Sequence, residues 1–364
     1  MIRTDGIGDA GRAIRLESRS AGEGGPFKVR TRDQAGTRSG NLRRRQALAV
    51  ALAAPLGLHI RPAAAAERLI GWISPESPDA TLPFFNALKA GLTAALPPGA
   101  EPVRILERYN VTTPTLAAAQ IAELQQAGVR LIVSQGAATV PVVTAQPAVP
   151  VVFGYSGDPV VAGIAQSMSR PGGNATGISF MSIELNPKRI DLVRTALPAC
   201  RRVALLSNAR HPGEEKEIAA CQAAVQSLGI DLSVHRAQSP AEIRATLAQA
   251  LDSGAQAVVM LPSSSMVQQA PVAAADCIAR RVPLISGWAE IARAGALMTY
   301  GPNLQEAYRR LALYVLRVMD GAAPATLPIE QPTVLELALN MKTAAVLGVT
   351  LPPTLLVQAG EIIE

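Results

Sequence analysis

Short apolar runs alternate with longer helical patterns along the chain from residue 68 onward. The runs are rich in Val, Ile and Leu and lack regular polar alternation, so helices are expected to cover both faces of the sheets that they form. Such alternation is typical of βαβ units and parallel sheets. Ten strands are more than a single sheet usually holds, and we therefore expect two sheets. The predicted strands are 69–74, 103–109, 131–134, 149–155, 176–180, 202–207, 231–235, 257–261, 283–287 and 296–300.

The first 66 residues differ in character from the rest. Residues 1–40 are rich in Gly, Arg, Ser and Asp without an apolar period, which predicts a disordered leader. Three arginines at 43–45, an apolar stretch over 47–60 and four alanines at 63–66 then follow in the order of a signal peptide. We expect export to the periplasm by the twin-arginine or the Sec route, with cleavage after Ala66.

The net charge of +6 is concentrated in this leader. Residues 1–66 hold 12 of the 34 Lys and Arg residues and 5 of the 28 Asp and Glu residues, which leaves 22 basic and 23 acidic residues beyond them. A protein that binds phosphates needs a concentrated basic surface. Nucleic acid is therefore not an expected partner.

Metal and cofactor chemistry has little support after residue 66. His211 and His235 are too few and too isolated for a histidine-rich metal site. The part after residue 66 contains no P-loop and no dinucleotide fingerprint, so no cofactor is expected. Cys200, Cys221 and Cys277 share no CxxC spacing and are expected to be buried, unreactive thiols.

Hydroxyls, amides and glycines follow most of the predicted strands. In open α/β sheets a ligand lies beyond the carboxyl ends of the strands, so these groups are candidate ligand contacts. They suit a neutral or zwitterionic solute, and no cluster pairs a nucleophile with a positioned base. Any one serine can instead simply cap the helix that follows it. The candidates, with the two aromatic residues that are placed to stack on a ligand, are Ser74, Ser77, Ser134, Gly136, Ala137, Tyr155, Asp158, Asn208, Ser263 and Trp288.

The dipeptide Asp158-Pro159 directly follows a predicted strand. Asp is a frequent helix cap and Pro a frequent first helical residue, so a helix is expected to begin here. The Asp158 carboxylate then either pairs with an ammonium group of a ligand or only caps the helix. The sequence leaves both interpretations open.

A long segment carries a family resemblance. Residues 156–177, SGDPVVAGIAQSMSRPGGNATG, resemble the hallmark segment of the ABC-transporter substrate-binding family that includes tryptophan- and tyrosine-binding proteins. Further similarity lies in ISPESPDATLPFFNALKAGL, RRVALLSNARHP, ALMTYGPN and LPIEQPTVLELALNMKTAAVLGVTLPPTLL. The resemblance covers essentially all of residues 67–364.

This resemblance implies an α/β fold of the type I periplasmic-binding-protein class, in which two Rossmann-like lobes with parallel sheets hold a ligand between them. Lobe 1 would comprise residues 67–177 and 300–329, and lobe 2 residues 178–299 and 330–364. Three segments would cross between the lobes, near 174–179, 300–303 and 328–332. The expected hinge residues are Asn174, Thr176, Gly177, Tyr300 and Gly301.

One position departs from the family pattern. Members usually carry Gly-Thr or Gly-Ser after the third strand, with a hydroxyl that meets a ligand carboxylate, whereas this chain has Gly136-Ala137. Ser134 or neighbouring backbone amides are possible substitutes. Specificity for an amino acid is therefore open.

The implied function is capture of a small molecule, such as an amino acid or a related metabolite, for a permease of an ABC importer in the inner membrane. The protein is expected to act as a monomer and to leave its ligand chemically unchanged. A periplasmic ligand sensor that feeds a signalling partner is an alternative. A Rossmann-like enzyme is a more remote one, because the mature chain lacks a cofactor fingerprint.

Overall fold

The computed structural model describes residues 68–211 and 213–364. The predicted disordered leader, the signal peptide and the cleavage point after Ala66 fall outside these residues. Among the helices of the described part, none is both long enough and apolar enough to cross a bilayer.

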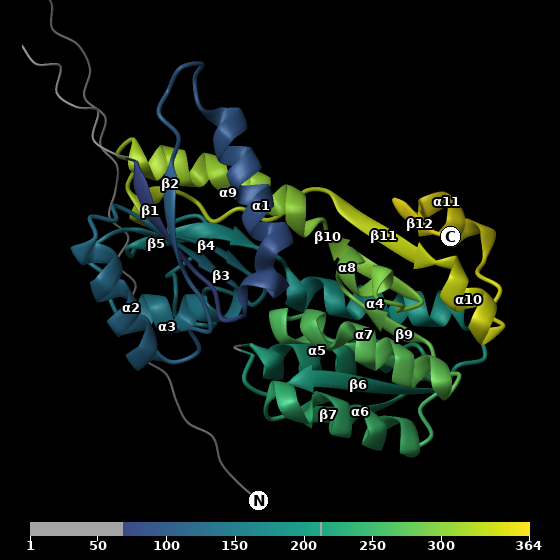
Figure 1. Ribbon diagram of the computed structural model, residues 1–364. Helices are drawn as coiled ribbons and strands as arrows, with labels where there is room; N and C mark the ends of the chain where they lie inside the picture. The colour runs from purple at the N-terminus through teal and green to yellow at the C-terminus, as the bar shows by residue number, and fades with distance from the viewer. Residues whose placement is uncertain (1–67, 212) are drawn as a thin grey trace, which may run out of the picture. The chain divides into compact units, whose positions relative to one another are not determined.

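The first of two sheets has five parallel strands in the order β2-β1-β3-β4-β5 (Figure 1). Its two faces are covered by different helices, because alternate side chains of each strand point to opposite sides. Helices α1 and α9 pack on one face, and α2 and α3 pack on the other. The elements are β1 (Leu69–Ile73), α1 (Pro78–Ala95), β2 (Arg104–Arg108), α2 (Pro114–Gln126), β3 (Ile132–Gln135), η1 (Gly136–Ala138), α3 (Thr139–Thr144), β4 (Val151–Tyr155), β5 (Ala175–Ser179) and α9 (Leu304–Met319).

The second sheet has seven strands in the order β12-β11-β10-β9-β8-β6-β7. All neighbours are parallel except β10 and β11, which are antiparallel. Helices α4 and α5 pack on one face, and α6 and α7 pack on the other. The elements are α4 (Ser182–Ala196), β6 (Arg202–Asn208), α5 (Glu214–Val225), β7 (Asp231–Ala237), η2 (Pro240–Glu242), α6 (Ile243–Asp252), β8 (Ala257–Met260), α7 (Ser264–Ala279), β9 (Leu284–Ser286), α8 (Ala289–Arg293), β10 (Met298–Pro302), η3 (Pro324–Thr326), β11 (Leu335–Asn340), α10 (Met341–Leu347), α11 (Pro353–Gln358) and β12 (Glu361–Ile363).

The predicted fold class is confirmed: the protein is α/β, with two sheets that are almost entirely parallel. Each of the ten predicted strands corresponds to one of β1 to β10. The sequence analysis missed β11 and β12. The first residues of β11 are only partly buried and β12 has three residues, so neither forms the continuous apolar run that marks the other strands.

Helix α9 follows β10 of the second sheet along the chain but packs on the first sheet beside α1 (Figure 1). The chain then returns to the second sheet at β11. Three connections therefore join the sheets: the one after β5, the one before α9 and the one before β11.

Two of these connections lie side by side. Residue Glu330 forms a parallel bridge with Ile178, and its backbone exchanges hydrogen bonds with the Gly177 carbonyl and the Ser179 amide, at 3.0 and 2.9 Å. The Thr176 hydroxyl donates to the Leu327 carbonyl at 2.7 Å. At Gly177 a Cβ atom would overlap with the Phe153 carbonyl oxygen of the adjacent strand. Only glycine therefore fits this position without moving the strand.

Replacing Gly177 by Ala should lower the free energy of unfolding by about 1 to 3 kcal/mol, the usual effect of overpacking a closely packed site. The matched control is Gly173→Ala, because a Cβ atom on Gly173 meets no atom within 4 Å and should change stability by under about 1 kcal/mol. Urea unfolding of both variants checks this. Equal losses in the two variants would show that the contact with Phe153 is not the cause.

Candidate ligand-binding site

The carboxyl ends of the two sheets face each other. Three contacts join the loops that follow their strands: Gln135 with Ser264, Ser156 with His211, and Phe180 with Trp288. The Gln135 amide donates to the Ser264 hydroxyl at 3.3 Å, and the Ser156 hydroxyl lies 2.8 Å from His211 Nε2. The Phe180 and Trp288 rings meet edge to face with centroids 6.4 Å apart. The ends of β3, β4 and β5 are therefore opposed to the ends of β6, β8 and β9, where a ligand of an open α/β sheet is expected.

Among the predicted residues of the first sheet, Ser74 and Gly136 lie at this boundary. The buried Ser74 hydroxyl donates to Gln135 Oε1 at 3.1 Å, and Gln135 in turn reaches Ser264. Gly136 has a left-handed backbone (φ 55°), and a Cβ atom there would lie 2.5 Å from the Ser264 hydroxyl oxygen. Absence of a side chain at Gly136 thus allows the loops of the two sheets to approach.

The other predicted residues of the first sheet are less clearly placed for a ligand. Ser134 is buried and its hydroxyl donates to Thr139 within the same loop, at 3.3 Å. Ala137 is exposed. Ser77 occupies the cap position of α1, but its side chain makes no capping hydrogen bond.

In the second sheet, Asn208, Ser263 and Trp288 lie at the ends of β6, β8 and β9. The Asn208 amide donates to the Ser265 hydroxyl at 3.0 Å. The Ser263 hydroxyl accepts from the Met266 amide at 3.4 Å and so caps α7, which is the structural role that the sequence left open for any such serine. Trp288 is buried and precedes α8.

Asp158 does not begin a helix, contrary to our expectation. Residues 159–163 form a turn, and Gly163 has a left-handed backbone (φ 71°) that ends it. Asp158 Oδ1 nevertheless accepts hydrogen bonds from the amides of Val160 and Val161, at 2.7 and 3.2 Å. The half-buried carboxylate also lines a small hollow of about 80 Å³ together with Glu184. It therefore has a capping contact without a helix.

A second expectation was wrong: the structure does pair a nucleophile with a base. Ser156 and His211 are 4% and 7% exposed and join the two sheets, and His211 Nδ1 lies 3.2 Å from Glu217 Oε1. The two atoms of that second contact are close but not aligned as a hydrogen bond. The Tyr155 ring stacks on His211 with centroids 6.3 Å apart, and the Asn186 amide donates to Glu217 Oε2 at 3.0 Å. A nearby carboxylate favours a proton on Nδ1, which leaves Nε2 to accept from the serine.

Sequence reasoning had set His211 aside as an isolated histidine, had noted Ser156 only as one of the polar residues that follow a strand, and had not considered Glu217 or Asn186. One signal was available for His211, because it lies four residues beyond a predicted strand and the other candidates also follow strands. Glu217 and Asn186 lie within helices α5 and α4, where no pattern marked them.

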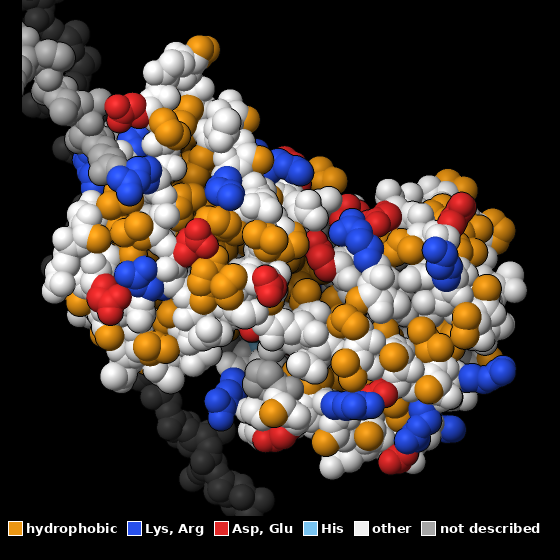
Figure 2. All heavy atoms as spheres, viewed as in Figure 1, with side chains coloured by type: hydrophobic (Ala, Val, Ile, Leu, Met, Phe, Trp, Pro, Cys, Tyr) orange, Lys and Arg blue, Asp and Glu red, His pale blue; other side chains and the backbone are white. Residues whose placement is uncertain are grey.

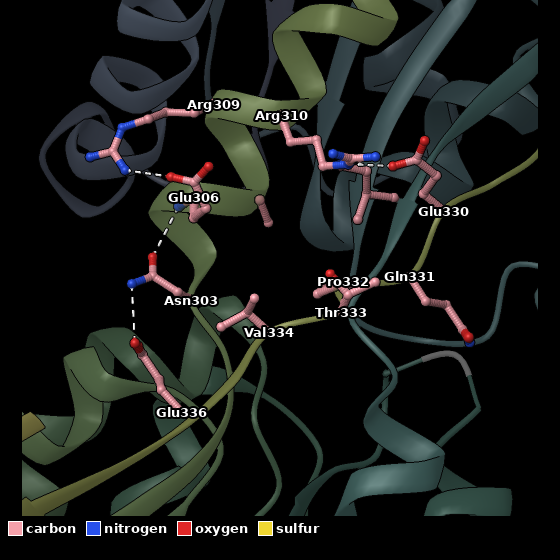
Figure 3. A pocket seen from close by; sticks show the side chains of 12 residues that line it. Asn303, Glu306, Arg309, Arg310, Glu330, Gln331, Pro332, Thr333, Val334 and Glu336 are labelled. Carbon is pink, nitrogen blue, oxygen red and sulfur yellow. Dashed lines mark hydrogen bonds and ion pairs between the residues drawn. The ribbon is translucent and has the colours of Figure 1, made fainter. Parts of the chain in front are cut away.

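A further hollow of about 490 Å³ lies beside the connections rather than at the strand ends (Figure 3). Four of its charged side chains form two ion pairs, Arg310 with Glu330 and Arg309 with Glu306 at 2.8 Å, and Glu336 accepts a hydrogen bond from the Asn303 amide. None of the predicted ligand contacts lines it.

The model of one protein family, described as ABC transporter substrate binding protein, matches residues 86–363. The chain belongs to this family. Among curated proteins, the tyrosine-binding protein of Clostridioides difficile (strain R20291) is 20% identical over 197 residues. That alignment covers 54% of this chain and 56% of the relative, so it spans little more than half of the relative's length.

Solved structures of low sequence identity share the fold. An ABC domain from Streptococcus pneumonia in complex with L-Trp superposes with a TM-score of 0.75 at 19% identity, covering 82% of this chain and all of that one. A conserved domain protein from Vibrio cholerae gives a TM-score of 0.74 at 18% identity, covering 81% and 99%. A ligand-free, open substrate-binding protein from Clostridium difficile gives 0.60 at 15% identity, covering 81% and 99%. The fold of this substrate-binding protein is thus that of type I periplasmic binding proteins.

Thr176, Gly177, Tyr300 and Gly301 of the predicted hinge residues lie in or beside the connections between the sheets, whereas Asn174 lies at the opposite end of β5. The Asn174 amide donates to the Pro147 and Val149 carbonyls, at 3.0 and 2.9 Å. Tyr300 lies in β10, and its carbonyl accepts from Arg189 Nε at 2.8 Å. Next to it, Gly301 approaches Gly287 so closely that a Cβ atom would overlap with the Gly287 carbonyl oxygen.

Acidic and basic side chains are interspersed over the face drawn in Figure 2.

Within residues 68–211 and 213–364, no group of three or more His, Cys, Asp or Glu side chains is arranged to hold a metal ion. The cysteines are buried free thiols, as expected, and burial raises the pKa of Cys221 and Cys277 to about 12.

Glu76 is a half-buried acid at the boundary between the sheets. It follows β1, and its side chain hydrogen-bonds with Gln268 of α7. Burial raises the pKa of the Glu76 carboxyl to about 7, and the hydrogen bond offsets part of that rise. Because the folded-state pKa is raised, the folded protein holds a proton that the unfolded chain has lost, and stability falls as pH rises from about 4.5 to about 7.

Glu76→Gln should therefore be more stable than the parent protein at pH 8, by about 1 to 2 kcal/mol after allowance for partial exposure, and the difference should shrink towards pH 5. Glutamine keeps a hydrogen-bonding group but carries no charge. The matched control is Glu101→Gln at an exposed position. Urea unfolding between pH 5 and pH 8 checks this, and a difference that stays constant with pH would contradict it.

Proposed function

We propose that this protein captures a small solute between its two sheets in the periplasm and delivers it to the permease of an ABC importer. The observation that supports this most is the opposition of the two sets of strand ends, which bear hydroxyls, amides and carboxyls and lie between the connections. Membership of the substrate-binding family points the same way.

In this proposal the two sheets are the cores of two lobes, predicted as residues 67–177 with 300–329 and residues 178–299 with 330–364. The strands move two of these bounds, since residues 178–179 belong to β5 of the first sheet and residues 300–302 to β10 of the second. Thr176, Gly177, Tyr300 and Gly301 lie where backbone rotation would move one lobe against the other. A solute that contacts both lobes would stabilise their closed arrangement, because only that arrangement provides both sets of contacts.

The solute is proposed to be an amino acid or a related metabolite. The support is the relative named for tyrosine binding and the similar structure that contains L-Trp. Tyr155 and Trp288 would provide aromatic surfaces, while Ser74, Asn208 and Asp158 would provide hydrogen bonds. Gly136-Ala137 lacks the usual hydroxyl for a carboxylate, so such a group needs another donor.

The leader supports export with cleavage after Ala66. The mature protein is further proposed to act as a monomer. A periplasmic sensor would share the same capture step and differ only in its membrane partner. Co-purification of the exported protein with a permease, rather than with a signalling receptor, separates the two.

An acyl-transfer enzyme is a second candidate because Ser156 contacts His211 and His211 contacts Glu217, the order of nucleophile, base and carboxylate in serine hydrolases. The hydroxyl and the imidazole belong to different sheets, however. A motion that opens the site to a substrate would separate them, and we therefore favour binding without chemistry. Covalent labelling of Ser156 by a fluorophosphonate would support the enzyme instead.

Asp158 provides a direct test of the binding proposal. Asp158→Asn keeps an oxygen for the Val160 and Val161 amides but removes the charge. If the carboxylate pairs with an ammonium group, stability should hardly change and affinity for the solute should fall about ten- to a hundred-fold, since a hydrogen bond to a charged group contributes about 1.5 to 3 kcal/mol.

Asp158→Ala should lose the same affinity and in addition about 1 kcal/mol of stability with the capping contact. Calorimetric titration with amino acids and thermal unfolding measure the two effects. If Asp158→Asn binds the solute as tightly as the parent protein and Asp158→Ala shows only a lower melting temperature, Asp158 acts only as a cap and the binding role is contradicted.

A further inference from the structure

Arg189 is a fully buried cation at the carboxyl ends of the central strands of the seven-stranded sheet. Its side chain is 0% exposed and rises from the middle of α4. A Cβ atom built on Gly287 would lie 2.6 Å from Arg189 Nη2, and one on Gly301 would lie 3.1 Å from it. Gly287 directly follows β9 and Gly301 is near the end of β10, so the guanidinium lies where these two parallel strands end.

The guanidinium uses only part of its hydrogen-bonding capacity. Nε donates to the Tyr300 carbonyl at 2.8 Å and Nη1 donates to Asn186 Oδ1. Among the residues that the structure describes, Nη2 has no hydrogen-bond partner although it is buried. The indole N–H of Trp288, the residue after Gly287, is likewise buried and has no hydrogen-bond partner among the described residues. Buried donors without acceptors are destabilising, which indicates that an acceptor from outside the chain belongs here.

In the part of the chain that the structure describes, no carboxylate hydrogen-bonds directly to the Arg189 guanidinium. The negative charge of Glu217 acts on it, but the Asn186 amide bonds to both side chains. Burial lowers the pKa of the Arg189 guanidinium to about 10, and the negative charge of Glu217 opposes that fall. The positive charge of this buried guanidinium is offset by Glu217 only across the Asn186 amide. An anion that bonds directly to the guanidinium would therefore stabilise it further.

We propose that Arg189 Nη2 binds the carboxylate of the captured solute. This inference rests on the proposed function, because it assigns the anion subsite of the same cleft. It also explains how the protein can bind a carboxylate although Gly136-Ala137 lacks the hydroxyl that family members usually have there. The donor is instead a charged side chain from the opposite sheet. Charged donors to a carboxylate form the stronger class of hydrogen bond.

The neighbouring glycines fit this role. Any side chain at Gly287 would occupy the space beside Nη2 and would also contact Pro262, 2.6 Å from the Cβ position. Glycine at this place leaves one edge of the guanidinium without a covering side chain. The solute would reach it once the opposed loops of the two sheets separate.

The test compares carboxylic acids with their primary amides, which have nearly the same shape but carry no negative charge. L-tryptophan and L-tryptophanamide, and L-tyrosine and L-tyrosinamide, are titrated calorimetrically into the parent protein. Each acid should bind about ten- to a hundred-fold more tightly than its amide. In Arg189→Lys this ratio should fall towards one, because lysine cannot present the same planar pair of N–H groups. The control is Arg194→Lys on the same helix, whose guanidinium donates to the Pro198 carbonyl, and there the ratio should stay as in the parent.

The outcomes separate this inference from the proposed function. Amides that bind the parent protein as tightly as acids would overturn the role of Arg189 while leaving solute capture intact, and this comparison holds even if Arg189→Lys fails to fold. An Arg189→Lys variant that weakens acid and amide equally would show a structural role and overturn the inference as well. Binding of none of the four compounds would contradict the proposed capture of amino acids, and the inference would fall with it.

Discussion

Polar groups enclosed between the ends of two opposed sheets must find partners, and this constraint organises the centre of the protein. Ser156 of the first sheet meets His211 of the second, and from His211 the contacts continue through Glu217, Asn186 and Arg189 to the Tyr300 carbonyl of β10. The chain of contacts thus runs from the boundary between the sheets to the strand that precedes α9. A change at either end, such as a solute that replaces the Ser156 hydroxyl or a rotation near Tyr300, must be accommodated along the whole chain.

The same constraint explains why buried charges gather here rather than in the cores. The cores on either face of each sheet are formed mainly by apolar side chains, such as Leu88 and Leu311 between α1, α9 and the first sheet. Glu76, Glu217 and Arg189 lie instead near strand ends, where neighbouring amides and hydroxyls partly replace water. Their burial reduces stability unless a partner supplies the missing hydrogen bonds or the opposite charge. A site that receives a polar solute is expected to contain such groups.

The sequence was informative where a local pattern is sufficient. Runs of Val, Ile and Leu mark β1 to β10 because these strands are covered on both faces, whereas the partly exposed β11 and the short β12 leave no such pattern. The rule that ligands bind beyond strand ends selected Ser74, Gly136 and Trp288, which do lie at the boundary. It could not select Asn186, Glu217 or Arg189, because these helical residues reach the boundary only through packing. At Asp158 the capping contact was predicted but the helix was not formed, since the chain turns at Gly163.

The central claim, that a solute is held by closure of one sheet against the other, can be tested by locking the two sheets together. A Cβ atom on Gly136 would lie 3.8 Å from the Ser264 Cβ, a separation typical of disulfides, and the three native cysteines are buried. In the double variant Gly136→Cys and Ser264→Cys, uptake and release of radiolabelled L-tyrosine or L-tryptophan are measured before and after oxidation. We expect oxidation to slow uptake by the empty protein and release from the loaded protein at least about ten-fold, with recovery on reduction. Equal rates in the oxidised and the reduced protein would contradict capture by closure.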